Sequence, residues 1–234
     1  ENKAFETQTF DVTLPATGGS TGGTAKPSGD AGKPSVRKDS STAAAKESVS
    51  LRFDDVRSAH WFADAVEYVT ENGIMNGTAA DTFSPNAPAT RAMLVTVLYR
   101  LAGSPEVEGK VSEVFTDCAD GSYYANAVLW ASQKGIVNGY GDTFKPNNAV
   151  TRQEMAKILY GYDKVMEKGG DVVTIELTYT DLSTIANWAL EGVNYCTAAG
   201  YMSGSNNQFN PKGNAVRAMT AQVLMNMTVE KEAA

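Results

Sequence analysis

The sequence predicts an all-α fold made of three helix-loop-helix repeats, and three observations lead to that prediction. A motif of the form aromatic-x-Asp occurs three times, ending at Asp55, Asp117 and Asp181. Each copy is followed by the same succession of glycine, Phe-x-Pro and arginine positions. Between these positions apolar residues recur at steps of three and four, which is the period of an amphipathic helix. Self-similarity of this kind is typical of repeat architectures.

Residues 1–50 differ from the rest of the chain in composition. Phe10, Val12 and Leu14 alternate with polar residues, as in a short strand, and could end an upstream domain. Between Leu14 and Leu51 there is no aromatic residue and no Leu, Ile or Met. Such a segment cannot bury enough apolar surface to offset its ordering entropy, so we expect a flexible linker, disordered or extended.

The linker contains Leu14-Pro15-Ala16-Thr17-Gly18, which resembles a sortase sorting pentapeptide. A working sorting signal also needs a hydrophobic stretch and a basic tail directly after it. Here a Gly/Ser-rich segment follows, so we favour a plain loop.

The first helix of each repeat is expected after the aromatic-x-Asp motif. Its apolar face in the first repeat is formed by Trp61, Ala65, Tyr68 and Val69. Gly73 follows, where a left-handed helix cap is expected. The matching helices of the other repeats are predicted over residues 123–134 and 185–199.

A glycine pair and a Phe-x-Pro motif separate the two helices of each repeat. The pairs are Gly73 and Gly77, Gly135 and Gly139, and Gly200 and Gly204. The motifs begin at Phe83, Phe144 and Phe209. Proline lacks the N–H that a helix interior needs, so each motif indicates a structured loop with its phenylalanine in the core.

The second helix of each repeat begins near an arginine. In the first repeat Thr90 is the expected N-cap, and the apolar positions are Met93, Leu94, Val97, Leu98 and Leu101. The other two are predicted over residues 151–165 and 216–228. One helical hairpin cannot bury both faces alone, so the three copies must pack on one another. The β-branched segment 172–179 is either a short strand or an extended connection.

These motifs together resemble the S-layer homology family, over about residues 51–228. The sequences Gly73-Ile74-Met75-Asn76-Gly77 and Gly135-Ile136-Val137-Asn138-Gly139 match its Gly-Ile-x-x-Gly motif, and Gly200-Tyr201-Met202-Ser203-Gly204 is a weaker copy. The family's Thr-Arg-Ala-Glu tetrad corresponds to Thr90-Arg91-Ala92-Met93, Thr151-Arg152-Gln153-Glu154 and Val216-Arg217-Ala218-Met219. Only the second tetrad keeps the glutamate. We divide the chain into a linker (1–50) and three repeats (51–109, 110–170 and 171–234).

The resemblance implies a pseudo-threefold bundle, or pseudo-trimer, whose inter-repeat grooves bind secondary cell-wall polysaccharide. In this family the glycan often ends in pyruvylated N-acetylmannosamine, and the tetrad arginine typically meets the pyruvate. The implied function is non-catalytic anchoring of an exported protein at the cell surface, with this chain fused to an upstream surface domain. We rank the groove of Arg152 first, because its tetrad is the most complete.

Four sets of residues are the predicted glycan-binding residues. They are the arginines Arg91, Arg152 and Arg217; the aromatic residues Trp61, Tyr123 and Trp188; the aspartates Asp55, Asp117 and Asp181; and the glycines Gly77, Gly139 and Gly204. An arginine at a helix start, with exposed N–H groups beside it, can hold a carboxylate. Aromatic rings can stack on sugar faces.

Each set also has a structural interpretation. The arginines could instead pair with the next repeat, and the aromatic residues could be core. The aspartates could be caps or turn formers, and the glycines could serve backbone geometry.

Composition excludes several function classes. The formal net charge of -7 argues against a general nucleic-acid binder. One histidine and two cysteines without a CxxC pair argue against zinc, and we expect Cys118 and Cys196 to be buried thiols. Asp81, Asp142 and Asn207 resemble only fragments of a calcium loop. We expect no metal, no cofactor and no membrane insertion, since no long apolar stretch occurs.

No catalytic motif stands out, so we expect no enzyme activity in this chain. The main alternative to glycan binding is a self-assembly module of a surface layer, in which the arginines only join the repeats. A third possibility is the accessory domain of a surface glycosidase or protease. The chain begins at Glu1 without Met, so we treat it as a piece of a longer protein.

Overall fold

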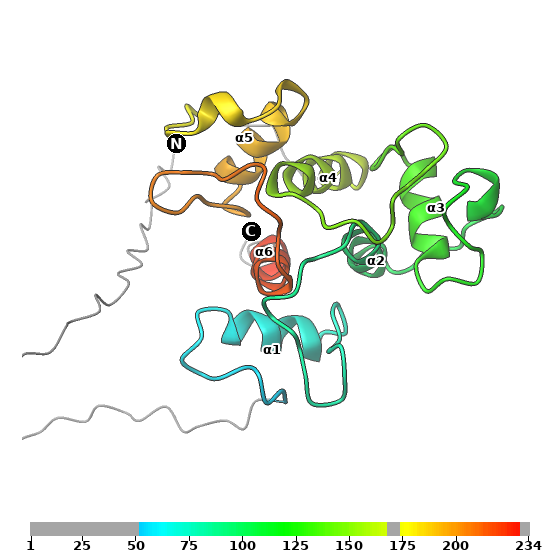
Figure 1. Ribbon diagram of the computed structural model, residues 1–234, viewed down its shortest axis with the longest axis horizontal. Coiled ribbons are helices and arrows are strands. Elements are labelled where there is room, and N and C mark those ends of the chain that lie inside the picture. Colours follow the sequence, from blue (N-terminus) through cyan, green and yellow to red (C-terminus); the bar gives the residue numbers. More distant parts are fainter. Residues whose placement is uncertain (1–51, 168–173, 230–234) are drawn as a thin grey trace, which may run out of the picture. The chain divides into compact units, whose positions relative to one another are not determined.

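The computed structural model describes residues 52–167 and 174–229, and in them every regular element is helical (Figure 1). The α-helices are α1 (Ala63–Glu71), α2 (Arg91–Leu101), α3 (Ala125–Gln133), α4 (Arg152–Val165), α5 (Leu190–Ala198) and α6 (Arg217–Val229). The short 3₁₀ turns are η1 (Val111–Glu113), η2 (Leu182–Thr184) and η3 (Asn187–Ala189). The predicted all-α fold is confirmed. The predicted linker lies outside the described residues.

Three local predictions, on the cap of α2, the glycine after α1 and the burial of the cysteines, are also confirmed. The Thr90 hydroxyl accepts a hydrogen bond from the Met93 N–H and so caps α2. Gly73 follows α1 with a φ of 66°. Both cysteines are buried free thiols. Residues 174–179 form no strand. Among the described residues, no helix has both the length and the apolar character needed to cross a bilayer.

The first helix of the third repeat is shorter than predicted. It begins at Leu190 rather than near residue 185. The backbone N–H of Ala186 donates to the Gln153 side chain at 3.0 Å, and Ala186 is extended there. The 3₁₀ turn η3 therefore comes before the α-helix.

The first helix of each repeat packs on the second helix of the preceding repeat. Helix α3 packs on α2, α5 on α4, and α1 on α6, which closes the ring (Figure 1). The helix-loop-helix repeats are as predicted, but the two helices of one repeat are not each other's main packing partners. The long glycine and Phe-x-Pro loop lets the chain cross to a neighbouring repeat before its second helix begins.

A closed ring of backbone hydrogen bonds lies where the three second helices start. The Ala89 N–H donates to Ala215 O at 2.8 Å, Val150 N–H to Ala89 O at 2.8 Å, and Ala215 N–H to Val150 O at 2.9 Å. All three residues are fully buried. This cyclic pattern confirms the predicted pseudo-threefold arrangement.

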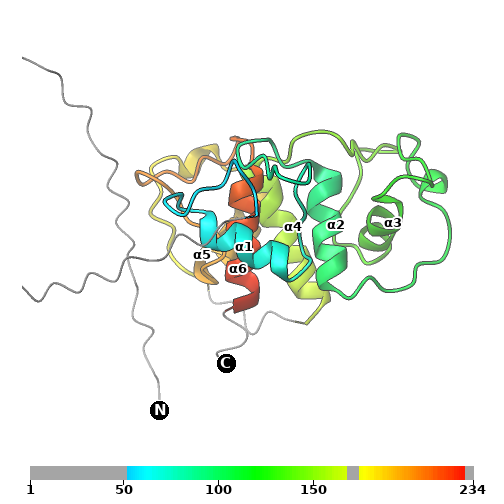
Figure 2. The same cartoon turned by 90° about the horizontal axis from the view of Figure 1, so that it is seen from below.

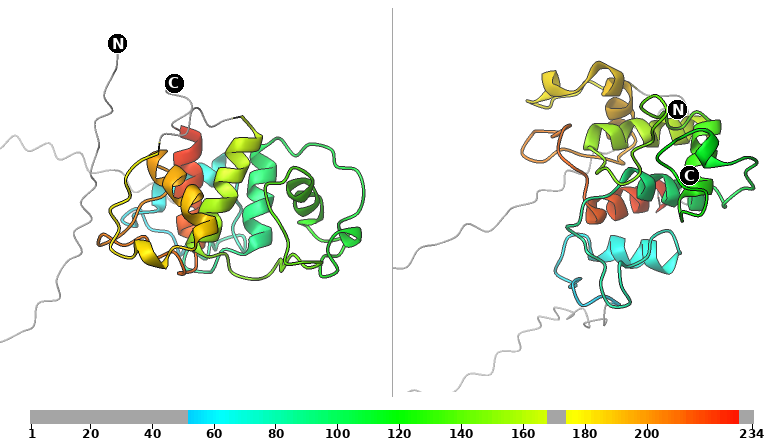
Figure 3. Two further views of the ribbon diagram at one scale, coloured as in Figure 1. Left: turned by 90° about the horizontal axis from the view of Figure 1, so that it is seen from above. Right: turned by 45° about the vertical axis from the view of Figure 1, so that its right-hand side comes forward.

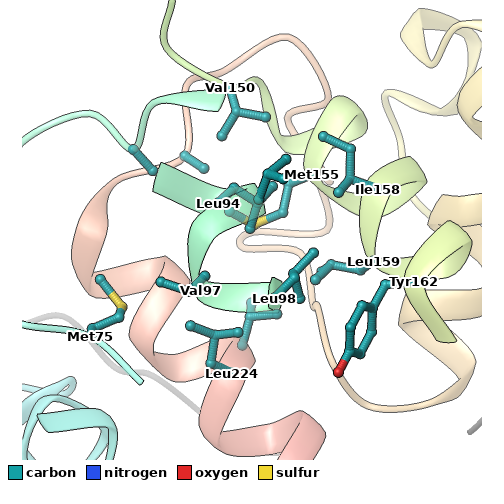
Figure 4. Close-up of a cluster of buried hydrophobic side chains, with 14 of the residues drawn as sticks. Met75, Leu94, Val97, Leu98, Val150, Met155, Ile158, Leu159, Tyr162 and Leu224 are labelled. Carbon is teal, nitrogen blue, oxygen red and sulfur yellow. The ribbon is translucent and has the colours of Figure 1, made fainter. Parts of the chain in front are cut away.

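The core fills the space between the second helices, which lie side by side (Figures 2 and 3). Figure 4 shows Leu94 and Leu98 of α2, Met155 and Leu159 of α4 and Leu224 of α6 gathered in one cluster. All five side chains are buried. The phenylalanines of the three Phe-x-Pro motifs are also completely buried, as predicted.

Candidate functional site

The arginine that starts each second helix joins its repeat to the next one. Arg91 donates from Nε to Phe144 O at 3.0 Å and from Nη2 to Asn138 O at 3.1 Å. Its guanidinium also lies 4.8 Å from the centre of the Phe144 ring. Arg152 and Arg217 repeat these contacts on the third and first repeats, with Nε–O distances of 2.7 and 2.8 Å. The acceptors are therefore backbone carbonyls.

The remaining nitrogen, Nη1, meets the fourth tetrad residue of the next repeat. For Arg91 this residue is Glu154, whose carboxylate lies 3.9 Å away. For Arg152 and Arg217 it is a methionine, with Nη1–Sδ distances of 3.9 and 3.1 Å. Of the three tetrad arginines, only Arg91 therefore has its Nη1 next to a carboxylate, because only the second tetrad contains a glutamate. Burial lowers the pKa of Arg152 and Arg217 below its usual value.

The exposed N–H groups expected at these helix starts are not free. The N–H of Arg91 donates to Asn148 O and that of Ala92 to Pro146 O, both at 3.0 Å. The third N–H is taken by the Thr90 cap. Helices α4 and α6 donate their first two N–H groups to loop carbonyls in the same way. The expectation of exposed N–H groups at these helix starts was therefore wrong, because carbonyls of the neighbouring repeat accept the first two of them.

The aspartates brace the Phe-x-Pro loops. Both carboxylate oxygens of Asp117 accept backbone N–H groups, from Phe144 and Lys145, at 2.7 Å each. Lys145 has a left-handed φ of 59°, a conformation that is costly without such support. Asp55 and Asp181 hold the equivalent residues at 2.7–2.8 Å. The aspartates therefore cap no α-helix but stabilise the loops.

The second glycine of each pair is required by packing. A Cβ atom on Gly77 would lie 2.5 Å from the Phe53 ring, and one on Gly204 would lie 2.6 Å from the Tyr179 ring. Gly139 faces Phe115 in the same way. These glycines allow the aromatic residue of the opening motif to pack against the loop.

The three aromatic residues ahead of the first helices are exposed. Trp61, Tyr123 and Trp188 show 60%, 69% and 53% of their surface. Trp61 does not belong to the buried face of α1, since the helix begins only at Ala63. Large rings in equivalent exposed positions are available for a ligand.

A cavity of about 620 Å³ lies against α4, beside the loop that follows α3 and the start of α5. Its lining includes Arg91, residues 135–140, Lys157, Tyr160, Lys164 and Trp188. The tetrad arginine that lines this cavity is Arg91. The groove that the tetrad sequences rank first as a glycan site is that of Arg152. Arg91 is only 5% exposed, because the Tyr140 ring lies 5.0 Å from its guanidinium.

Sequence reasoning missed Tyr140, Lys157 and Lys164. A comparison of the three copies contained a signal, because Tyr140 stands where the other repeats have Thr78 and Ser205. The Tyr140 hydroxyl donates to Glu154 Oε1 at 2.7 Å. Burial and this bond raise the pKa of Tyr140.

Replacing Glu154 with Gln is expected to destabilise the protein by about 1 kcal/mol at pH 7. Burial raises the Glu154 pKa, but hydrogen bonds from Thr151 and Tyr140 outweigh burial and hold the pKa below its usual 4.5. The ionised form therefore stabilises the fold above about pH 4.5, and this contribution is lost as the pH falls through the lowered pKa. Denaturant unfolding of both proteins from pH 7 to pH 3 measures the difference. A difference that stays constant over this range would contradict the prediction.

Comparison with known proteins gives a consistent pattern. The family model of the S-layer homology domain matches residues 52–92, 114–156 and 178–218. The chain is similar to an amylopullulanase of Thermoanaerobacterium thermosulfurigenes, at 31% identity over 74% of this chain and 9% of that protein. It is similar to the S-layer protein sap of Bacillus anthracis, at 28% identity over 74% of this chain and 20% of that protein. A cellulosome-anchoring protein of Acetivibrio thermocellus is 30% identical over 62% of this chain and 32% of its own length.

Proposed function

Because the chain belongs to the S-layer homology family, we propose that its repeats form a non-catalytic module that anchors an exported protein to the cell wall. The proposed ligand is a secondary cell-wall polysaccharide, held in the grooves between repeats. The chain spans only 9–32% of the three relatives described above. The activity named for the amylopullulanase therefore need not reside in the matched region.

The observation that carries this proposal is the threefold set of exposed rings. Trp61, Tyr123 and Trp188 occupy the same place in each repeat and stay more than half exposed. Sugar rings present apolar faces that stack well on such side chains. Trp188 also lines the cavity beside α4, so one ring of the set already borders a space large enough for a ligand.

Arg152 is the tetrad arginine best suited to contact an acidic sugar. It is half-buried, whereas Arg91 and Arg217 are only 5% and 8% exposed. Its Nη1 faces a methionine sulfur and forms no ion pair with a described residue, and the Asp181 carboxylate acts on the guanidinium only at longer range. The pyruvate implied by the family could pair with this nitrogen. We assign indirect roles to the aspartates and the glycines, which shape the loops beside the grooves.

The experiment is retention of the purified protein on cell-wall sacculi from its source organism. We expect Trp188→Ala to weaken retention about tenfold and Trp188→Phe to weaken it less, since phenylalanine keeps a ring. Acid stripping of the non-peptidoglycan polymer should abolish retention.

Retention that survives stripping would contradict a polysaccharide ligand and indicate peptidoglycan itself. No retention at all would overturn wall anchoring and favour self-assembly. The burial of Arg91 and Arg217 between repeats is compatible with that alternative.

A further inference from the structure

We call each contact between neighbouring repeats a joint; the three joints are α2–α3, α4–α5 and α6–α1. The α4–α5 joint carries two lysines that the equivalent positions of the other two joints lack. Lys157 and Lys164 lie two turns apart on α4 and both line the cavity. Counted from the tetrad, the equivalent residues are Thr96 and Gly103 in the first repeat and Gln222 and Val229 in the third. These two lysines therefore add positive charge beside the α4–α5 contact that the equivalent positions of the other repeats lack, on a protein whose net charge is -7.

The two lysines share one aromatic ring. The Nζ atom of Lys157 lies 5.4 Å from the centre of the Tyr160 ring, and that of Lys164 lies 5.6 Å from it. Tyr160 is held in place because its hydroxyl donates to Glu191 Oε1 at 2.7 Å. Gly192 allows α5 to lie close to α4, since a Cβ there would be 2.9 Å from Ala156 O. The ring, the lysines and the start of α5 thus form one side of the cavity.

The charges around the cavity do not cancel. Arg91 faces Glu154 at 3.9 Å, and Lys157 faces Glu191 at 3.9 Å. Lys164 has no ion-pair partner among residues 52–167 and 174–229. The pair of Lys157 and Glu191 is 44% and 61% exposed, so it is weak and can be exchanged for a ligand. The cavity therefore has a surplus positive charge at Lys164.

One residue of the cavity lining has a backbone oxygen without a hydrogen-bond donor among the described residues. Gly161 stands where the other repeats have Arg100 and Asn226. Arg100 donates to Ile74 O at 3.2 Å, and Asn226 donates to the equivalent oxygen of the third repeat at 3.4 Å. Gly161 has no side chain to do so, and the oxygen of Ile136 accepts no hydrogen bond from any residue that the structure describes. Ile136 lines the cavity.

We propose that Lys157 and Lys164 form an anion subsite for an acidic group, carboxylate or phosphate, carried by the wall polysaccharide. A hydroxyl of the same sugar donates to the Ile136 oxygen, and a sugar face stacks on Trp188. The proposal rests on the polysaccharide binding proposed above. It differs from recognition by a tetrad arginine, because Arg91 in this cavity is covered by Tyr140 and opposed by Glu154.

The first test compares the wild type with the double variant Lys157→Gln/Lys164→Gln on sacculi over a range of KCl concentrations. We expect the double variant to bind at least about tenfold more weakly at low salt and to depend less on salt. Lys110→Gln, an exposed lysine outside the cavity, is the control and should bind like the wild type. Equal binding of the double variant and the wild type would overturn the subsite and leave wall anchoring intact.

The second test does not depend on wall binding. The amide NMR signals of residues 135–140 and of α4 are followed during titration with methyl glucuronide, glycerol 1-phosphate and neutral methyl glucoside. We expect one or both acids to shift these signals in the wild type but not in the double variant, and the acid that does so identifies the group. Shifts by neither acid, or equal shifts in the double variant, would overturn the subsite.

Discussion

Replacing Arg217 with Ala is expected to lower the free energy of unfolding by about 3 kcal/mol. Arg217 donates to Phe83 O at 2.8 Å and to Asn76 O at 2.7 Å, and it is 8% exposed. These bonds connect the third repeat to the first. Removing the side chain leaves two carbonyls without their donors and a void beside the Phe83 ring, so the closing joint loses both polar and packing contacts.

Guanidinium unfolding followed by circular dichroism measures this effect. Arg57→Ala is a matched control, because Arg57 is an exposed arginine whose side chain forms no hydrogen bond or ion pair with the residues that the structure describes. It should change stability by less than about 0.5 kcal/mol. A loss below about 1 kcal/mol in the Arg217 variant would show that the backbone ring and the α1–α6 packing alone hold the joint.

Replacing Gly139 with Ala is expected to cost about 2–3 kcal/mol through overpacking. A Cβ atom at this position would overlap the Phe115 ring and lie 2.7 Å from Thr143 O. The backbone oxygen cannot move without disturbing the loop, and Phe115 cannot turn aside because its ring packs against Phe144 at 5.4 Å. The loop and the opening motif of the second repeat must therefore separate.

Gly121→Ala serves as the control for this substitution. A Cβ atom on Gly121 meets nothing within 4 Å, so the change should leave the melting temperature nearly unaltered. The measurement is the melting temperature of each variant, obtained by thermal unfolding. Equal melting temperatures would contradict the packing role assigned to the second glycine of each pair.

The helices could be predicted from sequence because their signals are local. The periodicity of α2, the cap at Thr90 and the glycine after α1 each depend on residues a few positions apart. The packing of each first helix on the second helix of the preceding repeat could not be predicted in this way. It depends on which surfaces meet across the chain, and periodicity shows only that a face is apolar.

The candidate site was predicted less completely than the fold. The positions of the tetrad arginines could be predicted from the repeats, but their hydrogen-bond acceptors could not. Every residue has a backbone carbonyl, so the sequence does not indicate which carbonyl an arginine meets. The exposure of Trp61 depended on where α1 begins, which was misplaced by two residues. Lys157 and Lys164 were not predicted, because the search compared residues shared by all three repeats and these lysines occur in the second repeat alone.

The docking of α1 on α6 has a consequence for an anchor under tension. In an open solenoid the terminal repeat has one neighbour and can be peeled away first. Here a pull on the chain ahead of Phe53 is resisted by the α1–α6 contact, the Ala89–Ala215 hydrogen bond and Arg217 together. The first repeat is held from both of its sides, so a force applied there would be shared around the ring.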